Sequence, residues 1–217
     1  MVLNQRLAAA ADPARSGFSL IELMAVMIIL AILMAFLLPR LTGMGEGVRG
    51  AATESFLRGQ MTAALGSYQD DMGDYPSSDW DRDGEAAPNT TNLGSEMLYL
   101  AFFAERFGGM NIHEDNLENT DGDRTRRSLT MFGKSDLFEL CDQWKNPIAY
   151  FHHRDYGRKD LYISYDNRSG ETLEVLVSAL ENPRTASFFN PRGFQLISAG
   201  VDGAFNTDDD ITNFSRD

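Results

Sequence analysis

The chain has 217 residues, which allows one globular domain with an anchor, or at most two small domains. It carries 32 Asp and Glu residues against 19 Lys and Arg, so its formal net charge at pH 7 is −13. This balance argues against binding to nucleic acid or anionic lipid, which needs basic patches, whereas dense carboxylates suit calcium. The single cysteine, Cys141, excludes an intramolecular disulfide, and its apolar neighbours predict that it is buried, with intermolecular pairing as the alternative.

Near the N-terminus lies an apolar segment long enough to cross a membrane as a helix. Residues 20–38 contain one polar residue, Glu22. A helix over residues 18–38 would extend roughly 31 Å, which matches the thickness of a bilayer core. We therefore predict a single transmembrane helix there. Arg6 and Arg15 precede the segment and favour a cytoplasmic N-terminus.

A carboxylate within an apolar helix is costly unless it is paired, neutralised or solvated. Glu22 therefore indicates a function, with a carboxyl group protonated at the membrane interface as the alternative. Two simpler interpretations of the segment are a signal anchor and a cleaved secretory signal peptide. The run ends Phe36-Leu37-Leu38-Pro39-Arg40, which lacks the small residues of a secretory cleavage site. A plain anchor explains neither Glu22 nor the Gly17-Phe18 junction.

The sequence Gly17-Phe18-Ser19-Leu20-Ile21-Glu22 resembles the processing site of type IV pilins and of the pseudopilins of type II secretion. The resemblance implies that a prepilin peptidase cuts after Gly17, removes residues 1–17 as a leader peptide, and methylates Phe18. It also gives Glu22 a partner, the N-terminal amine of Phe18 in a neighbouring subunit. Because an ion pair in low dielectric is favourable only with good geometry, this pair can set the register of subunits. Pro39 matches a proline of many family members and is expected to contribute to assembly.

The helix is expected to continue beyond the apolar segment, to a total extent of residues 18–72. Four glycines at residues 43–50 weaken its helical propensity, so we predict a flexible joint over residues 39–50. An apolar stripe at helical spacing follows, which should pack on a sheet before the helix ends near residues 71–73. The stripe consists of Leu57, Met61, Ala64, Leu65, Tyr68 and Met72.

Residues 73–217 are expected to form one globular domain. Polar composition predicts loops over residues 77–92 and 111–127, and apolar spacing predicts a short helix over residues 95–107. Residues 172–180 fit either a strand or a helix. Strands are predicted over residues 147–152, 160–165 and 193–199. The fold class is therefore α+β, with a long N-terminal helix laid against a small antiparallel sheet.

The resemblance extends into this domain at one turn. Trp144-Lys145-Asn146-Pro147 resembles the Trp-Gly-Asn-Pro turn that precedes a strand in the major pseudopilins, with Lys145 in place of the glycine. Family members are commonly shorter, so residues 77–135 are interpreted as an enlarged insertion in a pilin-like domain.

The C-terminal stretch is rich in carboxylates and glycine, and irregular loops of that composition suit calcium. It also resembles the calcium loop of the major pseudopilin of type II secretion. By position, the resemblance implies side-chain ligands from Asp202, Asp209 and Asp210. It implies backbone carbonyl ligands from Ala199 and Thr207, with Asp208 as a further candidate. Calcium there would replace the disulfide of many pilins; the alternative is a solvated acidic tail.

Two other acidic runs are weaker candidates for calcium. Asp79, Asp81 and Asp83 copy the first half of an EF-hand loop, but Thr90 stands where a glutamate belongs, which favours a solvated turn. The run over residues 119–123, which contains Asp121 and Asp123, fits the pattern less well.

The histidine pair His152-His153 is expected to point to opposite faces of a strand, which would prevent joint metal ligation. The sequence contains no phosphate-binding loop, nucleophile elbow or zinc-helix motif. We therefore expect no enzymatic activity.

Together these features predict a structural role. The resemblance implies a subunit of the periplasmic pseudopilus of a type II secretion system, anchored once in the inner membrane with its C-terminal domain in the periplasm. It would polymerise with itself, and its partners would be the prepilin peptidase, minor pseudopilins and the inner-membrane assembly platform. One alternative is a subunit of a surface type IV pilus, against which the single cysteine and the calcium-type loop argue. Another is a non-polymerising, membrane-anchored binding module that shares only the processing motif.

Overall fold

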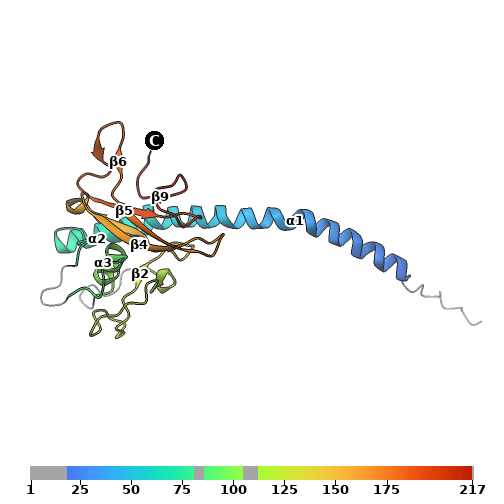
Figure 1. Cartoon of the computed structure of the whole chain (residues 1–217), viewed down its shortest axis with the longest axis horizontal. Coiled ribbons are helices and arrows are strands. Elements are labelled where there is room, and N and C mark those ends of the chain that lie inside the picture. Colours follow the sequence, from blue (N-terminus) through green and yellow to red (C-terminus); the bar gives the residue numbers. More distant parts are fainter. Residues whose placement is uncertain (1–18, 81–85, 105–111, 217) are drawn as a thin grey trace, which may run out of the picture. The chain divides into compact units, whose positions relative to one another are not determined.

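The computed structural model describes residues 19–80, 86–104 and 112–216, without the side chains of residues 37–44. The chain divides into two compact units, Met1–Met44 and Gly45–Asp217. Figure 1 labels the helices and strands along the chain. Helices and small antiparallel sheets make up the described residues, which confirms the predicted α+β class.

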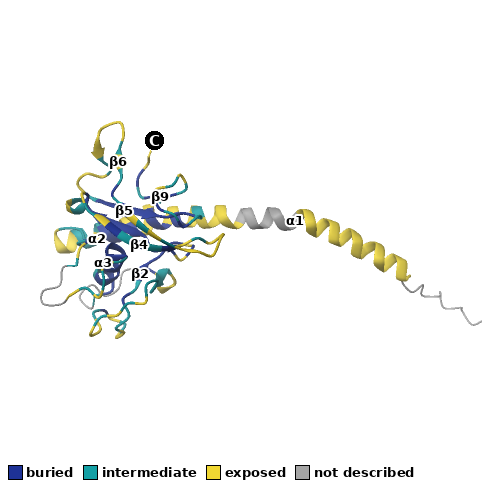
Figure 2. Cartoon of the chain, viewed as in Figure 1, coloured by how far each residue is buried: buried dark blue, intermediate teal, exposed yellow. Residues whose placement is uncertain are grey.

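Helix α1 covers Leu20–Ser55, a stretch rich in the strong helix formers Leu, Met and Ala. It runs without interruption through residues 39–50, and the flexibility predicted for that stretch stays a prediction. The side chains of residues 19–36 are all exposed (Figure 2). None of the helices in the described part of the chain combines the length and the apolar character that a membrane crossing needs. The transmembrane span predicted over residues 18–38 is thus not confirmed.

Directly after α1 the chain forms a π-helical turn, η1 (Phe56–Met61), and then helix α2 (Thr62–Met72). The hydroxyl of Thr62 donates a hydrogen bond to the carbonyl oxygen of Leu57 at 2.8 Å, five residues back. The sequence pattern did not predict this wider turn. Gly73 ends α2 in the left-handed conformation, with φ of 87°, as expected for a helix C-terminus near residues 71–73.

The predicted apolar stripe packs into the main core. Leu57, Met61 and Leu65 are fully buried, and each such side chain stabilises the fold by about 1.5–3 kcal/mol. Tyr68 packs at the edge of this core. Met72 is 40% exposed, so the buried stripe ends before the position that the sequence predicts.

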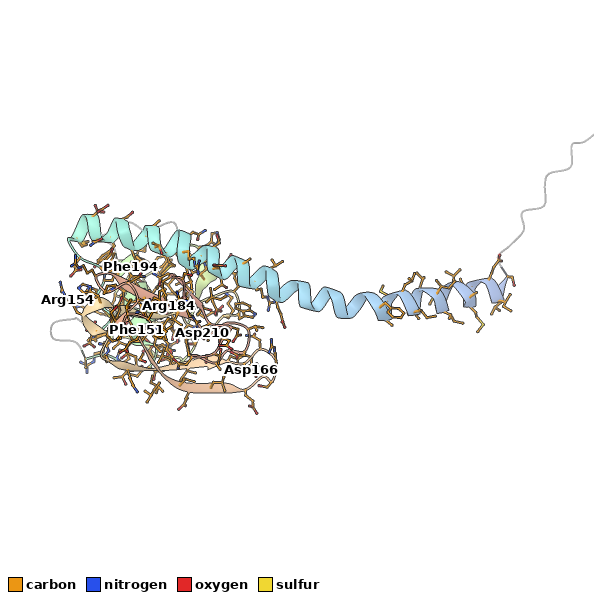
Figure 3. All side chains as sticks on the ribbon, turned by 90° about the horizontal axis from the view of Figure 1, so that it is seen from above. Phe151, Arg154, Asp166, Arg184, Phe194 and Asp210 are labelled. Carbon is orange, nitrogen blue, oxygen red and sulfur yellow. The ribbon has the colours of Figure 1, made fainter. Side chains whose placement is uncertain are left out.

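The main sheet is antiparallel and has three strands in the order β3 (Ala149–His152), β8 (Phe194–Ser198) and β9 (Ile211–Thr212). Phe151 and Phe194, labelled in Figure 3, lie on its two neighbouring strands β3 and β8. A longer hairpin, β4 (Lys159–Tyr165) with β5 (Thr172–Ser178), forms a separate two-stranded sheet. All three strand predictions are confirmed, and the ambiguous residues 172–180 are mainly strand.

Short elements complete the described fold. Strand β1 (Leu117–Glu118) pairs with β2 (Glu139–Leu140), and β6 (Glu181–Asn182) pairs with β7 (Ser187–Phe188). Two 3-10 turns are η2 (Glu114–Asn116) and η3 (His153–Asp155). The sequence predicts a loop over residues 111–127, so η2 and β1 are additions to that prediction.

Helix α3 (Leu93–Phe102) confirms the short helix predicted over residues 95–107. It begins two residues earlier and ends five residues earlier than predicted. Most of its side chains are buried, so the segment 77–135 contributes directly to the core. A Cβ atom on Gly94 would collide with the carbonyl oxygen of Tyr150 and lie 2.7 Å from the hydroxyl of Tyr162. Glycine therefore lets α3 lie close against β3.

In the turn before β3, Lys145 adopts the backbone conformation expected of the glycine in a Trp-Gly-Asn-Pro turn. Lys145 has φ of 68°, a left-handed conformation that favours glycine. The Asp142 carboxylate holds the turn, because its Oδ1 accepts hydrogen bonds from the N–H groups of Trp144 at 2.8 Å and Asn146 at 3.1 Å. Cys141 is fully buried, as predicted, and burial raises the pKa of its thiol.

Candidate functional site

Of the predicted processing and assembly residues, Glu22 is the one whose side chain the structure describes. Gly17 and Phe18 lie outside the described residues, and Pro39 lies within α1 with its side chain outside them. Glu22 is exposed in the first turn of α1, and its Oε2 accepts a hydrogen bond from the Ser19 N–H at 3.3 Å. In a single chain the carboxylate thus complements the helix N-terminus. Its pairing with the Phe18 amine of a neighbour stays a prediction.

The first part of α1 presents an apolar surface that the single chain leaves uncovered. Leu20 is 78% exposed and Phe36 is 76% exposed. The other large apolar side chains between them are exposed by 46% to 76%. A continuous apolar surface of this kind marks a contact with lipid or with other protein chains.

The C-terminal loop between β8 and β9 brings two of the predicted calcium ligands together. Asp209 Oδ2 accepts hydrogen bonds from the N–H groups of Val201 at 2.9 Å and Asp202 at 3.1 Å. Thr207 donates its hydroxyl to Asp209 Oδ1 at 2.5 Å. Asp202 Oδ1 in turn accepts from the Ala204 N–H at 2.8 Å. Backbone and hydroxyl donors therefore already hold this pair of carboxylates in place.

The two carboxylates affect each other's ionisation. Burial, and then the charge of Asp209, raises the pKa of Asp202. Burial acts to raise the pKa of Asp209 as well, but its hydrogen bonds from Thr207 and the loop backbone outweigh burial and lower it. A cation beside the pair would relieve the repulsion that Asp202 experiences.

Asp210 is held differently from this pair. Its Oδ2 accepts from the Asn206 N–H at 3.0 Å and lies 3.6 Å from Arg216 Nη2, while its buried Oδ1 has no partner among the described residues. Burial raises the pKa of Asp210 to about 7, although Arg216 opposes that shift. Arg216 also donates to the Thr207 carbonyl oxygen at 3.2 Å, so two of the predicted ligands already face a guanidinium.

The remaining predicted ligands contribute less to a shared centre. Asp208 is exposed, and Ala199 is fully buried. Two groups of three metal-binding side chains have ligand atoms within 4.8 Å of one another in the described chain, and neither includes a residue of this loop. Asp202 and Asp209 thus fit a cation best, whereas Asp210 and Thr207 do not fit without movement of Arg216.

The side chain of Arg58, in η1, binds the C-terminal residues of the chain. Arg58 donates its Nε to the Thr212 carbonyl oxygen at 3.1 Å and its Nη2 to the Phe214 carbonyl oxygen at 3.2 Å. These bonds hold the end of the chain without a disulfide.

The second predicted calcium run is engaged elsewhere where the structure describes it. The Asp79 carboxylate lies 3.2 Å from Arg158 Nη1 and accepts from the Trp80 N–H at 2.9 Å. Asp81 and Asp83 lie outside the described residues.

The prediction for His152 and His153 is wrong. β3 ends at His152 and His153 begins η3, so strand alternation does not separate the two rings. Their centroids lie 4.3 Å apart, and with Asp74 they form one of the two groups of close ligand atoms. Arg154 already supplies a cation there, because its guanidinium Nη2 lies 2.5 Å from Asp74 Oδ2. The backbone N–H of Arg154 also donates to His152 Nδ1 at 3.1 Å.

The structure reveals one group of carboxylates of which the sequence patterns indicated only Asp121 and Asp123. Glu96, Asp121 and Glu139 have ligand atoms within 4.8 Å of one another, and Asp123 is close enough to Glu96 to interact with it. These four residues are named the Glu96 cluster. Burial, followed by neighbouring negative charges, raises the pKa of Glu96 to about 10. Burial also raises the pKa values of Asp123 and Glu139 to about 7. The one further sequence feature that could have indicated this cluster is Glu96, a glutamate within the apolar run of α3.

Comparison with known proteins bears on the N-terminal segment. Residues 12–38 match the family model of the prokaryotic N-terminal methylation motif. No curated protein and no solved structure matches the chain. The motif match supports a type IV pilin-like protein that is processed as a prepilin and belongs to the membrane or envelope. It does not distinguish a pseudopilus from a pilus.

Proposed function

We propose that the chain is a structural subunit of the periplasmic pseudopilus of a type II secretion system. The observation that carries this proposal is the methylation motif over residues 12–38, which includes Gly17, Phe18 and Glu22. The precursor inserts in the inner membrane through residues 18–38. Prepilin peptidase then cuts after Gly17 and methylates Phe18.

Assembly follows from two features of α1. The exposed apolar side chains of residues 20–36 become covered by lipid and by neighbouring subunits, and each buried side chain contributes about 1.5–3 kcal/mol. Glu22 loses water as this surface is covered, and the Phe18 amine of the next subunit offsets that cost. A subunit in the wrong register would leave the carboxylate unpaired.

The other partners of this role are minor pseudopilins and the inner-membrane assembly platform. The chain itself catalyses no reaction in this account. The C-terminus supports a pseudopilus over a surface pilus, because Arg58 and the acidic loop hold it without a disulfide.

We also propose that the C-terminal loop binds calcium, with Asp202 and Asp209 as its side-chain ligands. Their proximity and the raised pKa of Asp202 support this site. Thr207 and Asp210 join it only if the contacts of Arg216 rearrange, and Ala199 and Asp208 are further candidates. Asp202→Asn is expected to remove one equivalent of bound calcium from the full chain.

The assembly step is tested with Glu22→Gln in the native host, compared with Glu46→Gln. Glu46 is an exposed glutamate of the same helix, so the chemical change is matched. Glu22→Gln is expected to reach the membrane and give no filaments by electron microscopy, whereas Glu46→Gln gives normal filaments. Normal filaments from Glu22→Gln would contradict the register role.

The neighbouring genes separate the alternatives. A secretin, an assembly ATPase and further pseudopilin-type N-termini favour secretion. A retraction ATPase favours a surface pilus. The absence of all of these favours a membrane-anchored binding module.

A further inference from the structure

The Glu96 cluster is assembled from three separate segments of the globular unit. Glu96 lies on α3 and Glu139 on β2, while Asp121 and Asp123 lie in the turn that follows β1. β1 and β2 are paired, with Glu118 opposite Glu139, which brings that turn to the end of β2. The fold thus brings ligand atoms of Glu96, Asp121 and Glu139 within 4.8 Å of one another, with Asp123 beside Glu96.

Glu96 is the member that most clearly lacks a partner. Its side chain is 0% exposed, and neither carboxylate oxygen has a hydrogen-bond partner among the described residues. Asp123 Oδ1 is likewise buried without a partner. An ionised carboxylate buried without a donor or a cation costs several kcal/mol, so Glu96 must either meet a cation or be protonated in the native protein.

The other members are held in fixed orientations. Glu139 is fully buried, and its oxygens accept from Asn92 Nδ2 at 3.0 Å, the Thr120 hydroxyl at 3.0 Å and the Thr120 N–H at 2.9 Å. Asp121 Oδ2 accepts from Asn89 Nδ2 at 2.7 Å. These donors orient the carboxylates without neutralising them, because amides and hydroxyls carry no charge.

Nearby basic side chains pair with other acids. Arg124, next in sequence to Asp123, lies 2.8 Å from Asp136, and Lys145 lies 2.8 Å from Glu118. The cluster therefore collects negative charge without a matching cation from these residues.

We propose that the Glu96 cluster binds one calcium ion through the side chains of Glu96, Asp121 and Glu139, with Asp123 beside Glu96 at the edge of the site. Two oxygens bound to the same Ca²⁺ can be at most about 5 Å apart, since each Ca–O distance is about 2.3–2.6 Å. The 4.8 Å limit on the ligand atoms of Glu96, Asp121 and Glu139 meets this condition. Magnesium fits less well, because it usually keeps several waters, and Glu96 and Glu139 are fully buried.

The bound ion joins α3 to the β1–β2 pair. It thereby ties two parts of the segment 77–135, α3 and the turn after β1, to β2, which lies outside that segment. This site is independent of the C-terminal loop and of the filament role, so either of those can fail without affecting it.

Protonation is the competing solution, because Glu96 and Asp123 are close enough to share a proton. The variant Glu96→Gln distinguishes protonation of the cluster from calcium binding. Glutamine copies the shape and neutrality of a protonated glutamate, but it removes a negatively charged ligand. A proton-sharing cluster tolerates this change, whereas a calcium site does not.

The test is a calcium titration of the chelator-stripped full chain by isothermal titration calorimetry. Glu96→Gln is expected to weaken one binding event at least about ten-fold and to remove most of the calcium-induced rise in melting temperature. Glu114→Gln, an exposed glutamate of η2, is the matched control and should behave as the wild type. The same comparison in an Asp202→Asn background keeps the C-terminal loop out of the measurement.

Unchanged calcium binding and unchanged calcium stabilisation in Glu96→Gln would overturn the site. Asp121→Asn provides a second variant at a half-buried turn position, in case the α3 substitution prevents folding. Its expected effect is the same weakening, and wild-type affinity in Asp121→Asn would also overturn the proposal.

Discussion

Glu22 and Glu96 are both single acids in apolar helical sequence, yet the structure treats them differently. Glu22 is exposed at the start of α1 and accepts the Ser19 N–H. Glu96 is buried within α3, and the described residues offer its carboxylate oxygens neither a hydrogen-bond donor nor a cation. The Glu22 carboxylate is hydrated in the single chain, and its burial costs free energy only when other molecules cover α1. The Glu96 carboxylate is costly from the moment the domain folds.

An acid in an apolar helix raises the question of which cation or proton neutralises it once it is buried. For Glu22 we propose the N-terminal amine of a neighbouring subunit. For Glu96 we propose calcium. In both cases the ion pair would report correct assembly, of a filament in one case and of a domain in the other.

The largest expected effect is the pH dependence of stability that Glu96 and its carboxylate neighbours produce. Glu96, Asp123 and Glu139 have raised pKa values in the fold, so they bind protons more tightly there than in the unfolded chain. Their stabilisation is complete below their ordinary pKa values. It is lost as the pH rises through about 7 for Asp123 and Glu139, and through about 10 for Glu96.

The melting temperature of the chelator-stripped full chain is therefore expected to fall by several degrees between about pH 5 and about pH 8. Calcium should reverse the fall, because it binds the ionised carboxylates. Differential scanning calorimetry at several pH values measures both effects. A melting temperature that rises over this range in the absence of calcium would contradict the prediction that ionisation of these carboxylates destabilises the fold.

A smaller effect is expected at Asp209, an acid that the chain itself satisfies. Asp209→Ala removes the acceptor for the Val201 and Asp202 N–H groups and the Thr207 hydroxyl. Hydrogen bonds to a charged group are strong, so the loss should be about 2–3 kcal/mol. Urea denaturation of the full chain measures it.

Asp208→Ala is the control, because Asp208 is the exposed neighbour, and its effect should stay within about 0.5 kcal/mol. The pKa of Asp209 is lowered, so its contribution is lost as the pH falls through that lowered pKa, opposite in direction to the Glu96 cluster. Equal stability of Asp209→Ala and Asp208→Ala at neutral pH would show that the loop contacts contribute nothing.

Local patterns in the sequence predicted much of the fold. The end of α2 at Gly73, the strands β3, β4 and β8, and the burial of Cys141 follow from periodicity, turn residues and composition. The π-helical turn η1 was missed, because it depends on backbone hydrogen bonding that apolar spacing does not encode.

The candidate sites were harder to predict, because their residues come together only in the fold. The Glu96 cluster joins α3, β2 and the turn after β1, and its sequence motif covers only Asp121 and Asp123. The histidine prediction failed because β3 ends one residue earlier than alternation requires. In contrast, the processing motif is contiguous, so the sequence alone could identify it.

The proposed function rests on the cation for Glu22, which exists only after the leader is removed. Mass spectrometry of the protein purified from its native host tests this most directly. We expect a chain that begins at Phe18 with one methyl group on its amine. A chain that still begins at Met1, in a host with an active prepilin peptidase, would contradict the account.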